Sequence, residues 1–196
     1  MEQQFDLIQI EKSLPKKETR IKKYVSIMYM LHNCDVSKYE IFRKSYNDFY
    51  KMRQRSREYY DIYFKYLEQQ KNNLFITFGD ILTYIYENTG RCEASFSSKF
   101  LATINPNMPV WDTNVLSNLS IKVPYNNCKN RIEKIINIYS ELCEYYKGFM
   151  TTDNAKQIIR LFDDIFPQYN SITDIKKIDL AIWSLGVKPQ KSKSKK

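Results

Sequence analysis

The fold of this chain is decided by residues 93–116, EASFSSKFLATINPNMPVWDTNVL. The first half of this segment is apolar at helical spacing, and the same spacing returns after residue 112. Between the two halves, Pro106 and Pro109 end the first helix, because proline lacks the amide donor and fixes its own φ. Asp112 then stands where a carboxylate caps the free amides of a second helix. The segment therefore predicts two helices joined by a proline turn.

Helical spacing of apolar residues extends from this segment over most of the chain. The predicted helices cover about residues 17–32, 37–70 with a break near 53–56, 77–90, 95–104, 112–119, 129–148, 152–166 and 173–186. Ser37 and Glu40 have the spacing of a capping box, and Gly90 stands where a helix ends. Only four glycines occur, which argues against a turn-rich β fold. The prediction is an all-α protein, a compact multi-helix bundle with one lobe or two.

Length and charge predict one folded domain and a basic tail. The chain has 196 residues, enough for a single domain over residues 1–187 with its own core. Its net charge is +9, and five lysines in residues 188–196 account for more than half of this excess. These last residues contain almost no apolar side chain that could be buried, so they are predicted to be disordered. An excess of positive charge favours a polyanionic partner, and DNA is the partner that we expect.

Several classes of function lack their usual motifs. The chain has no glycine-rich loop of the kind that binds nucleotide phosphates. Its four cysteines are scattered and His32 is its only histidine, so neither a metal nor a cofactor is predicted. No apolar run approaches the roughly 20 residues that cross a bilayer, and the first residues lack the pattern of a secretion signal. We therefore expect a cytoplasmic protein with no membrane partner.

The proline turn resembles the core of the helix-hairpin-helix DNA glycosylases. In that family an apolar helix follows the hairpin, and a Pro-hydrophobic-hydrophobic-Asp turn delivers the catalytic carboxylate. Here the turn reads Pro109-Val110-Trp111-Asp112. The chain also resembles a group of small bacterial proteins of unassigned role. The elements shared with that group are Ser98-Lys99-Phe100, Asn105-Pro106, the turn at 109–112, and a late segment from Asp179 to Trp183.

The resemblance implies a DNA glycosylase that hydrolyses the N-glycosidic bond of a modified or damaged base flipped out of the duplex. Asp112 would be the catalytic residue and would stabilise the cationic sugar in the transition state. The residues implied to contact DNA are Arg91, Ser97, Ser98, Lys99 and Asn114.

Each of these residues also has a simpler interpretation. Asp112 is more simply explained as a helix cap, and Lys99 as a solvated charge on a helix surface. Trp111 and Trp183 are more simply core residues than platforms for a base. The tyrosine-rich helices between residues 39 and 66 fit either a nucleic-acid surface or, as we favour, an aromatic core face backed by basic residues.

A second functional hypothesis follows from the hairpin. The glycosylase hairpin carries two glycines that bring backbone amides to a DNA phosphate, whereas the matching residues 89–93 contain only Gly90. This departure favours a non-catalytic module that binds nucleic acid or protein and keeps the fold without the chemistry.

Deleting residues 188–196 should leave the melting temperature nearly unchanged, because the deletion removes almost no apolar surface. DNA affinity should fall and its salt dependence should flatten, since up to five cationic contacts are lost. Thermal melts and DNA titrations at several salt concentrations compare the two chains. A marked loss of stability would show that this segment packs against the rest of the protein.

Overall fold

The computed structural model describes residues 4–125 and 128–186. Over these residues the protein is built from helices alone, with no β-strand, so the predicted all-α class is confirmed. The α-helices are α1 (Leu7–Ser13), α2 (Glu18–Asn33), α3 (Glu40–Phe49), α4 (Arg57–Gln70), α5 (Phe78–Thr89), α6 (Ala94–Ile104), α7 (Thr113–Leu119), α8 (Arg131–Phe149), α9 (Asp153–Ile165) and α10 (Asp174–Ser184). Two 3-10 turns, η1 (Pro15–Lys17) and η2 (Pro167–Tyr169), precede α2 and α10.

Six of the described α-helices begin at a residue whose side chain caps the first turn. Thr77 and Asp80 form a reciprocal capping box at the start of α5, and Gly90 ends α5 with a φ of 68°. Thr152 and Thr173 accept hydrogen bonds from first-turn amides of α9 and α10. These ends agree with the sequence-based predictions, as does the break between α3 and α4.

Two local predictions are wrong. The first helix, α1, was not expected, because its seven residues are too few for an apolar period to stand out. Asp6 begins it by accepting hydrogen bonds from the amides of Ile8 and Gln9. The capping box expected at Ser37 does not form, because the Ser37 hydroxyl donates to the carboxylate of Asp35 at 2.6 Å. Helix α3 starts without a side-chain cap.

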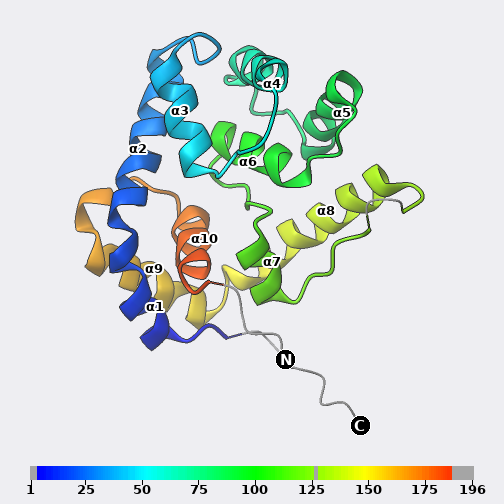
Figure 1. Ribbon diagram of the computed structural model, residues 1–196. Coiled ribbons are helices and arrows are strands. Elements are labelled where there is room, and N and C mark those ends of the chain that lie inside the picture. Colours follow the sequence, from blue (N-terminus) through cyan, green and yellow to red (C-terminus); the bar gives the residue numbers. More distant parts are fainter. Residues whose placement is uncertain (1–3, 126–127, 187–196) are drawn as a thin grey trace.

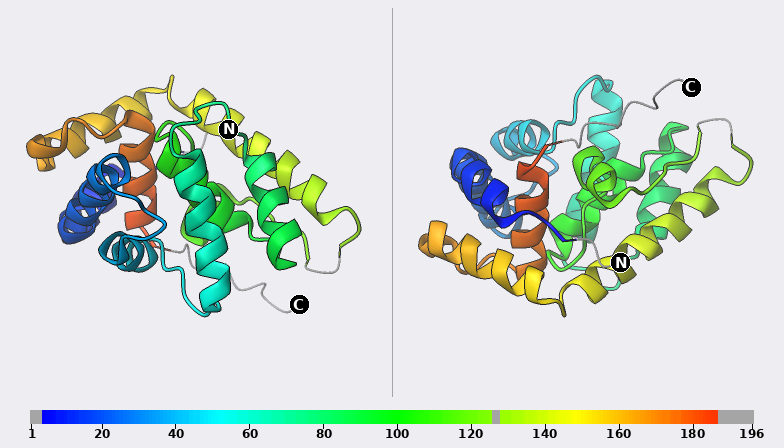
Figure 2. Two further views of the ribbon diagram at one scale, coloured as in Figure 1. Left: turned by 90° about the horizontal axis from the view of Figure 1, so that it is seen from above. Right: turned by 90° about the horizontal axis from the view of Figure 1, so that it is seen from below.

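The helices form two groups joined by α8 (Figures 1 and 2). Helices α1, α2, α9 and α10 lie in one group, α4, α5 and α6 lie in the other, and α7 lies between them. Helix α3 packs on α2, α7 packs on α10, and α8 contacts α5. Helix α1 contacts both α9 and α10, so the first and last helices of the chain lie side by side. One continuous cluster of buried apolar residues runs through both groups.

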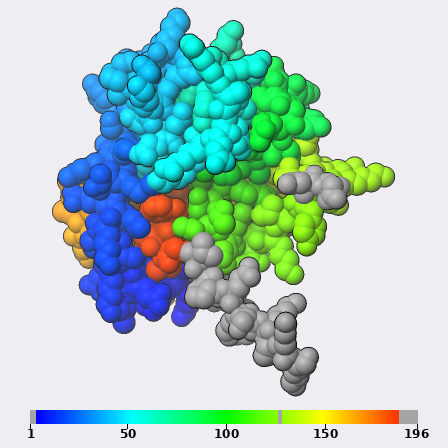
Figure 3. Space-filling view, in the orientation of Figure 1, coloured from blue at the N-terminus to red at the C-terminus, as the bar shows by residue number. Residues whose placement is uncertain are grey.

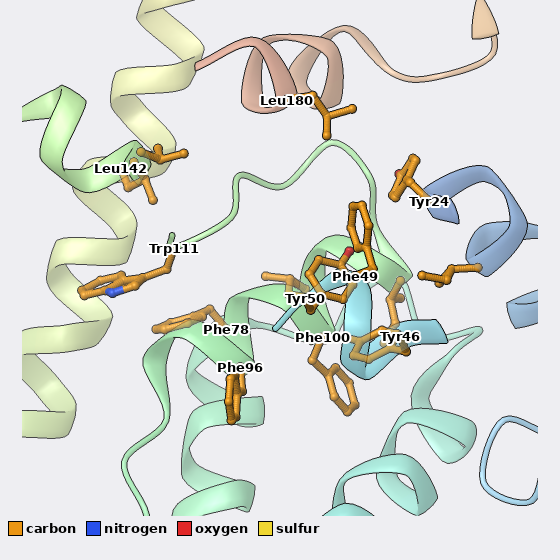
Figure 4. Packing of buried hydrophobic residues seen from close by; sticks show 14 of the residues in the cluster. Tyr24, Tyr46, Phe49, Tyr50, Phe78, Phe96, Phe100, Trp111, Leu142 and Leu180 are labelled. Carbon is orange, nitrogen blue, oxygen red and sulfur yellow. The ribbon is translucent and has the colours of Figure 1, made fainter. Parts of the chain in front are cut away.

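Aromatic side chains dominate the centre of this core (Figure 4). Tyr46, Tyr50, Tyr59 and Tyr63 are all buried, at 4% exposure or less. The hydroxyls of Tyr46 and Tyr63 are 2.8 Å apart, and the Tyr63 hydroxyl donates to the carbonyl of Phe96 at 2.9 Å. Aromatic pairs of this kind contribute about 0.5–1.5 kcal/mol each beyond their burial. The aromatic face of α3 and α4 is therefore core, as we favoured from the sequence.

Two further expectations concern membrane contact and the tail. Of the helices in the described ranges, none combines the length and the apolar character that spanning a membrane requires. The predicted basic tail, residues 188–196, lies outside the described residues.

Two glycine-to-alanine substitutions should change stability in opposite directions. At Gly90 the backbone is left-handed, so Gly90→Ala should destabilise the protein by about 1 kcal/mol. Gly148 lies within α8, where alanine is the better helix former, so Gly148→Ala should stabilise by about 0.5 kcal/mol. An added Cβ meets no atom within 4 Å at either site, so the effects come from the backbone. Urea unfolding measures both, and equal effects would contradict the assignment.

Candidate functional site

The turn between α6 and α7, residues 105–112, is held by hydrogen bonds from other parts of the chain. The carbonyl of Pro106 accepts a 2.8 Å bond from the hydroxyl of Thr173, the N-cap of α10. The carbonyl of Pro109 accepts a 2.9 Å bond from the buried hydroxyl of Tyr139 on α8. Both carbonyls would otherwise be unpaired, since proline turns make few backbone bonds of their own. Tertiary contacts therefore set the position of the turn.

Trp111 anchors the end of the turn in the core. Its indole is 5% exposed and lies nearly parallel to the ring of Phe78, with 6.5 Å between the ring centroids. In Figure 4, Trp111 points toward α8, the helix that carries Leu142. The amide of Trp111 donates to the hydroxyl of Ser98 at 2.9 Å. Trp111 is a core residue, in agreement with the simpler interpretation, and Ser98 ties the turn to α6.

Asp112 begins α7, as the sequence predicts. Its Oδ1 accepts a 2.9 Å hydrogen bond from the amide of Asn114, and the side chain is half-buried. Its Oδ2 has no hydrogen-bond donor within the described residues. One oxygen therefore fixes the carboxylate, and the other is left to face a ligand or water.

Asp112 lines a small cavity between α2, α10 and the loop after α3. The cavity has a volume of about 50 Å³, and its charged and aromatic lining includes Arg20, Lys51, Asp112, Lys176, Asp179 and Trp183. In the space-filling view, α10 reaches the surface as a red patch between α2, α3 and α7 (Figure 3). A space of this size holds a few water molecules, at about 10–15 Å³ each.

Arg20 and Trp183 lie in contact at the cavity. The guanidinium of Arg20 is 4.6 Å from the ring centroid of Trp183 and 5.4 Å from that of Phe49, and it donates to the carbonyl of Phe49. The ammonium of Lys17 lies 4.9 Å from the Trp183 ring. Such cation–π contacts contribute about 0.5–2 kcal/mol. Trp183 is half-buried beneath these cations, so the prediction that it is an ordinary core residue is wrong.

Lys99 is buried, and the expectation of a solvated surface charge is wrong. Its side chain turns inward from α6, where Nζ donates to the carbonyl of Tyr50 at 2.9 Å, and the residue is 6% exposed. Burial lowers the pKa of Lys99 to about 8, although attraction to the carboxylate of Asp112 opposes the change. The amine thus lies behind the Asp112 cavity rather than on a surface that DNA could reach.

The other residues predicted to contact DNA lie in three places. Ser97 and Ser98 are fully buried and donate to the carbonyls of Glu93 and Ser95, so in this conformation neither hydroxyl can reach a phosphate. Asn114 is half-buried, and its amide lies 3.4 Å from the carbonyl of Trp183. Arg91, with a side chain 53% exposed, lies between α5 and α6 in the residues that the resemblance matches to the hairpin, and it does not line the Asp112 cavity.

A buried ion pair, which the sequence did not reveal, supports the cavity from α10. Nζ of Lys176 lies 3.0 Å from Oδ2 of Asp179, and both residues are at most 5% exposed. The hydroxyl of Tyr146 is 3.3 Å from Oδ1 of Asp179. Burial raises the pKa of Asp179, while the Lys176 ammonium opposes that change. Spacing of three residues along a helix was the only sequence signal for this pair.

A second hollow, the hairpin groove, lies between residues 90–93 and the start of α8. It has a volume of about 1170 Å³, and the side chains that characterise it are Arg55, Tyr86, Arg91, Glu93, Arg131 and Glu133. Oε1 of Glu93 accepts hydrogen bonds of 2.9 Å from the Nε atoms of both Arg55 and Arg91. Arg131 donates to the carbonyl of Cys92 at 3.2 Å. The groove shares no lining residue with the Asp112 cavity.

Comparison with family models, with curated proteins and with solved structures found no match. The resemblance to the helix-hairpin-helix glycosylases therefore stays a prediction that depends on the turn at residues 109–112 and on the order of helices. Among residues 4–125 and 128–186, no three His, Cys, Asp or Glu side chains are grouped as metal ligands.

Lys99→Met should abolish one pH-dependent contribution to stability. The folded pKa of Lys99 is about 8, below its usual value of 10.5, so between these values the unfolded chain binds more protons at this residue. The wild type should therefore gain stability relative to the variant as pH rises through this window, by up to about 3 kcal/mol. Urea unfolding between pH 7 and pH 10.5 measures this difference.

Lys65→Met is the matched control, because Lys65 is exposed on α4. This variant removes the same charge at an exposed position, and the pH dependence of Lys99→Met is compared with it. An equal pH dependence for both variants would show that the Lys99 amine is solvated.

Proposed function

We propose that this protein acts on DNA and hydrolyses the N-glycosidic bond of a modified or damaged base that has left the duplex. The proposal rests on the Asp112 carboxylate in the cavity wall, with Oδ1 occupied by the α7 cap and Oδ2 without a donor in the described part of the chain. A carboxylate fixed in this way can stabilise the positive charge that develops on the sugar as the bond to the base breaks. The likeness of residues 109–112 to the glycosylase turn supports the same role.

The side chains around Asp112 suit a nucleotide that has been unstacked from its neighbours. The Trp183 ring lies at the cavity, with the Lys17 ammonium 4.9 Å from its centroid, and a base could take the place of Lys17 on this face. Stacking of a base on an aromatic ring contributes about 1–3 kcal/mol. The Arg20 guanidinium, adjacent to the same ring, could pair with a flanking phosphate.

Substrate entry requires the cavity to open. Its volume of about 50 Å³ is well below the roughly 300 Å³ at which ligand sites begin. Lys51 lies in the wall with a φ of 56°, and Gln54 in the same loop has a φ of 62°. Left-handed non-glycine residues cost about 1–2 kcal/mol each, so a change of conformation in this loop would relieve strain, and we expect the cavity to open there. Water that stays beside Asp112 after the cavity has opened would be positioned for attack on the sugar.

A non-catalytic binding module is the second candidate, and one observation favours it. Lys176 and Asp179 satisfy each other, and Lys99 is paired with a backbone carbonyl, so most charges at the cavity have structural partners. In such a protein Asp112 is only the cap of α7. The module would keep the turn as a joint between α6 and α7 and bind nucleic acid or protein elsewhere on its surface.

Asp112→Asn separates the two candidates. Asparagine caps a helix about as well as aspartate, so the free energy of unfolding should fall by no more than about 1 kcal/mol. If Asp112 is catalytic, base release should fall by at least about 100-fold, because the charge opposite the sugar cation is lost. Formation of abasic sites on a panel of damaged and modified duplexes is the measurement.

Asp6→Asn is the matched control for this experiment. Asp6 is also an N-cap aspartate, on α1, and it is not among the residues that line the cavity. This variant should release bases at the wild-type rate. Equal release by Asp112→Asn and wild type would remove Asp112 from the active site, and no release by the wild type on a broad panel would favour the binding module.

A further inference from the structure

We propose that Lys176 and Asp179 select the base that enters the Asp112 cavity: a neutral base that carries a carbonyl beside a ring N–H, as uracil and hypoxanthine do, and that leaves as an anion. The Lys176 ammonium would donate to the carbonyl oxygen, and the Asp179 carboxylate would accept from the N–H. The inference rests on the proposed function, because it takes an extruded nucleotide as the ligand of the cavity. Enzymes that extrude a base read it through hydrogen bonds to this edge and through stacking on aromatic rings.

One face of α10 supplies an aromatic ring, an acceptor and a donor. Lys176, Asp179 and Trp183 follow one another at spacings of three and four residues, and all three line the cavity. Residues at these spacings lie on the same side of a helix, with about 5–6 Å between neighbouring Cβ atoms. A base stacked on the Trp183 ring would therefore have its edge one helical turn away, at Asp179. Asp112 begins α7, which packs on α10, so the sugar of the same nucleotide would lie toward the Asp112 carboxylate.

The ion pair keeps hydrogen-bonding capacity that its own members do not use. An ammonium has three donors, yet Nζ of Lys176 makes a single hydrogen bond within the described residues, to Oδ2 of Asp179 at 3.0 Å. Its other close neighbours are aromatic faces, with the ring centroids of Tyr24 and Tyr50 at 5.1 and 5.9 Å. Asp179 accepts one further bond, from the Tyr146 hydroxyl, although a carboxylate offers about four acceptor positions. Lys176 is only 2% exposed, and a buried cation that lacks acceptors is costly, so an acceptor from a ligand or water fits here.

The charge of the cavity favours a base that becomes negative. Its lining holds three cations, on Arg20, Lys51 and Lys176. Only two carboxylates, those of Asp112 and Asp179, oppose them there. An alkylated base that carries positive charge, such as N7-methylguanine, would meet a net repulsion in this lining. A neutral base would instead be attracted as it leaves, since preorganised charges stabilise charge that develops in the transition state.

The hydrolysis of such a base needs no proton from Lys176. The bond between C1′ of the sugar and the base nitrogen breaks, and both electrons of the bond leave with the base. The negative charge spreads onto the carbonyl oxygen, where the Lys176 ammonium stabilises it through a hydrogen bond. Water adds its oxygen to C1′, and one of its protons ends on the base nitrogen. The products are a neutral free base and an abasic sugar, and the Lys176–Asp179 pair is unchanged.

A chemical change in the base tests the pairing without any change in the protein. Methylation of the ring N–H, as in 3-methyluracil, removes the donor that Asp179 would accept and leaves both carbonyl groups in place. The wild type should release 3-methyluracil at least about 10-fold more slowly than uracil, and should bind a single-stranded oligodeoxynucleotide with one uracil at least about threefold more tightly than the methylated strand. N7-methylguanine should be accelerated less, over its spontaneous release, than uracil. Equal handling of uracil and 3-methyluracil, or greater acceleration of N7-methylguanine, overturns the proposal.

The double substitution Lys176→Met with Asp179→Leu removes the pair from the protein. Replacing a buried ion pair by apolar residues of similar size is often neutral for stability, so this variant should fold. Its preference for uracil over 3-methyluracil should disappear, and uracil release should fall by about 10- to 100-fold.

Lys177→Met with Asp163→Leu is the matched control. Nζ of Lys177 on α10 donates to Oδ2 of Asp163 on α9 at 3.0 Å, and neither residue lines the cavity. This variant should keep both the rate of uracil release and the preference for uracil. Equal losses in the two double variants, or a preference that survives the loss of Lys176 and Asp179, overturn the proposal.

The release and binding assays separate this inference from the proposed function. If base release depends on Asp112 but uracil and 3-methyluracil are released alike, the Lys176–Asp179 pair does not read the base and the enzyme assignment stands. If the wild type releases no base while the uracil strand binds more tightly than the methylated strand, and the variant without the pair loses this difference, the pair reads the base in a protein without catalysis. The absence of both release and base-dependent binding overturns both proposals.

Discussion

The hydrogen bond between the Trp111 amide and the Ser98 hydroxyl ties the end of the proline turn back to the middle of α6. The backbone amide of Trp111 makes this hydrogen bond, and its indole ring is buried in the core, so the turn is held both by a polar contact and by packing. The direction of α7, the placement of Asp112 and the contact between α7 and α10 all depend on this joint. Ser98, a polar residue in an apolar helix, therefore helps to fix the position of the turn.

The charges behind this joint are unusual for a small helical protein. Lys99, Lys176 and Asp179 are all buried, and removing ionic groups from water costs several kcal/mol for each one. Apolar side chains of similar size would stabilise a core at least as well. These charges lie near the cavity wall that carries Asp112. Preorganised charges act most strongly where water is excluded, so a role in setting the electrostatic potential of the cavity would explain why they are buried there.

Sequence patterns predicted those parts of the structure that a single residue decides. Thr77 and Gly90 mark the ends of α5, and the cap at Asp112 follows from its distance to the prolines. Burial of Lys99 and Lys176 could not be predicted, because a lysine on a helix is normally solvated. The acceptor of Lys99 is a backbone carbonyl from a distant segment, and the acceptor of Lys176 is a carboxylate that is itself buried under packed helices. The fold class was therefore accessible from sequence, whereas the charged environment of the site was not.

The contact between Arg20 and Trp183 joins residues from nearly opposite ends of the chain. The cavity beside them also needs Asp112 from the middle, so it exists only after distant segments have met. Contacts so far apart in sequence close late in folding, since the entropy of a long loop must first be overcome. A nascent chain that still lacks α10 has no such cavity. Any function that depends on the cavity therefore begins only when the segments that line it have come together.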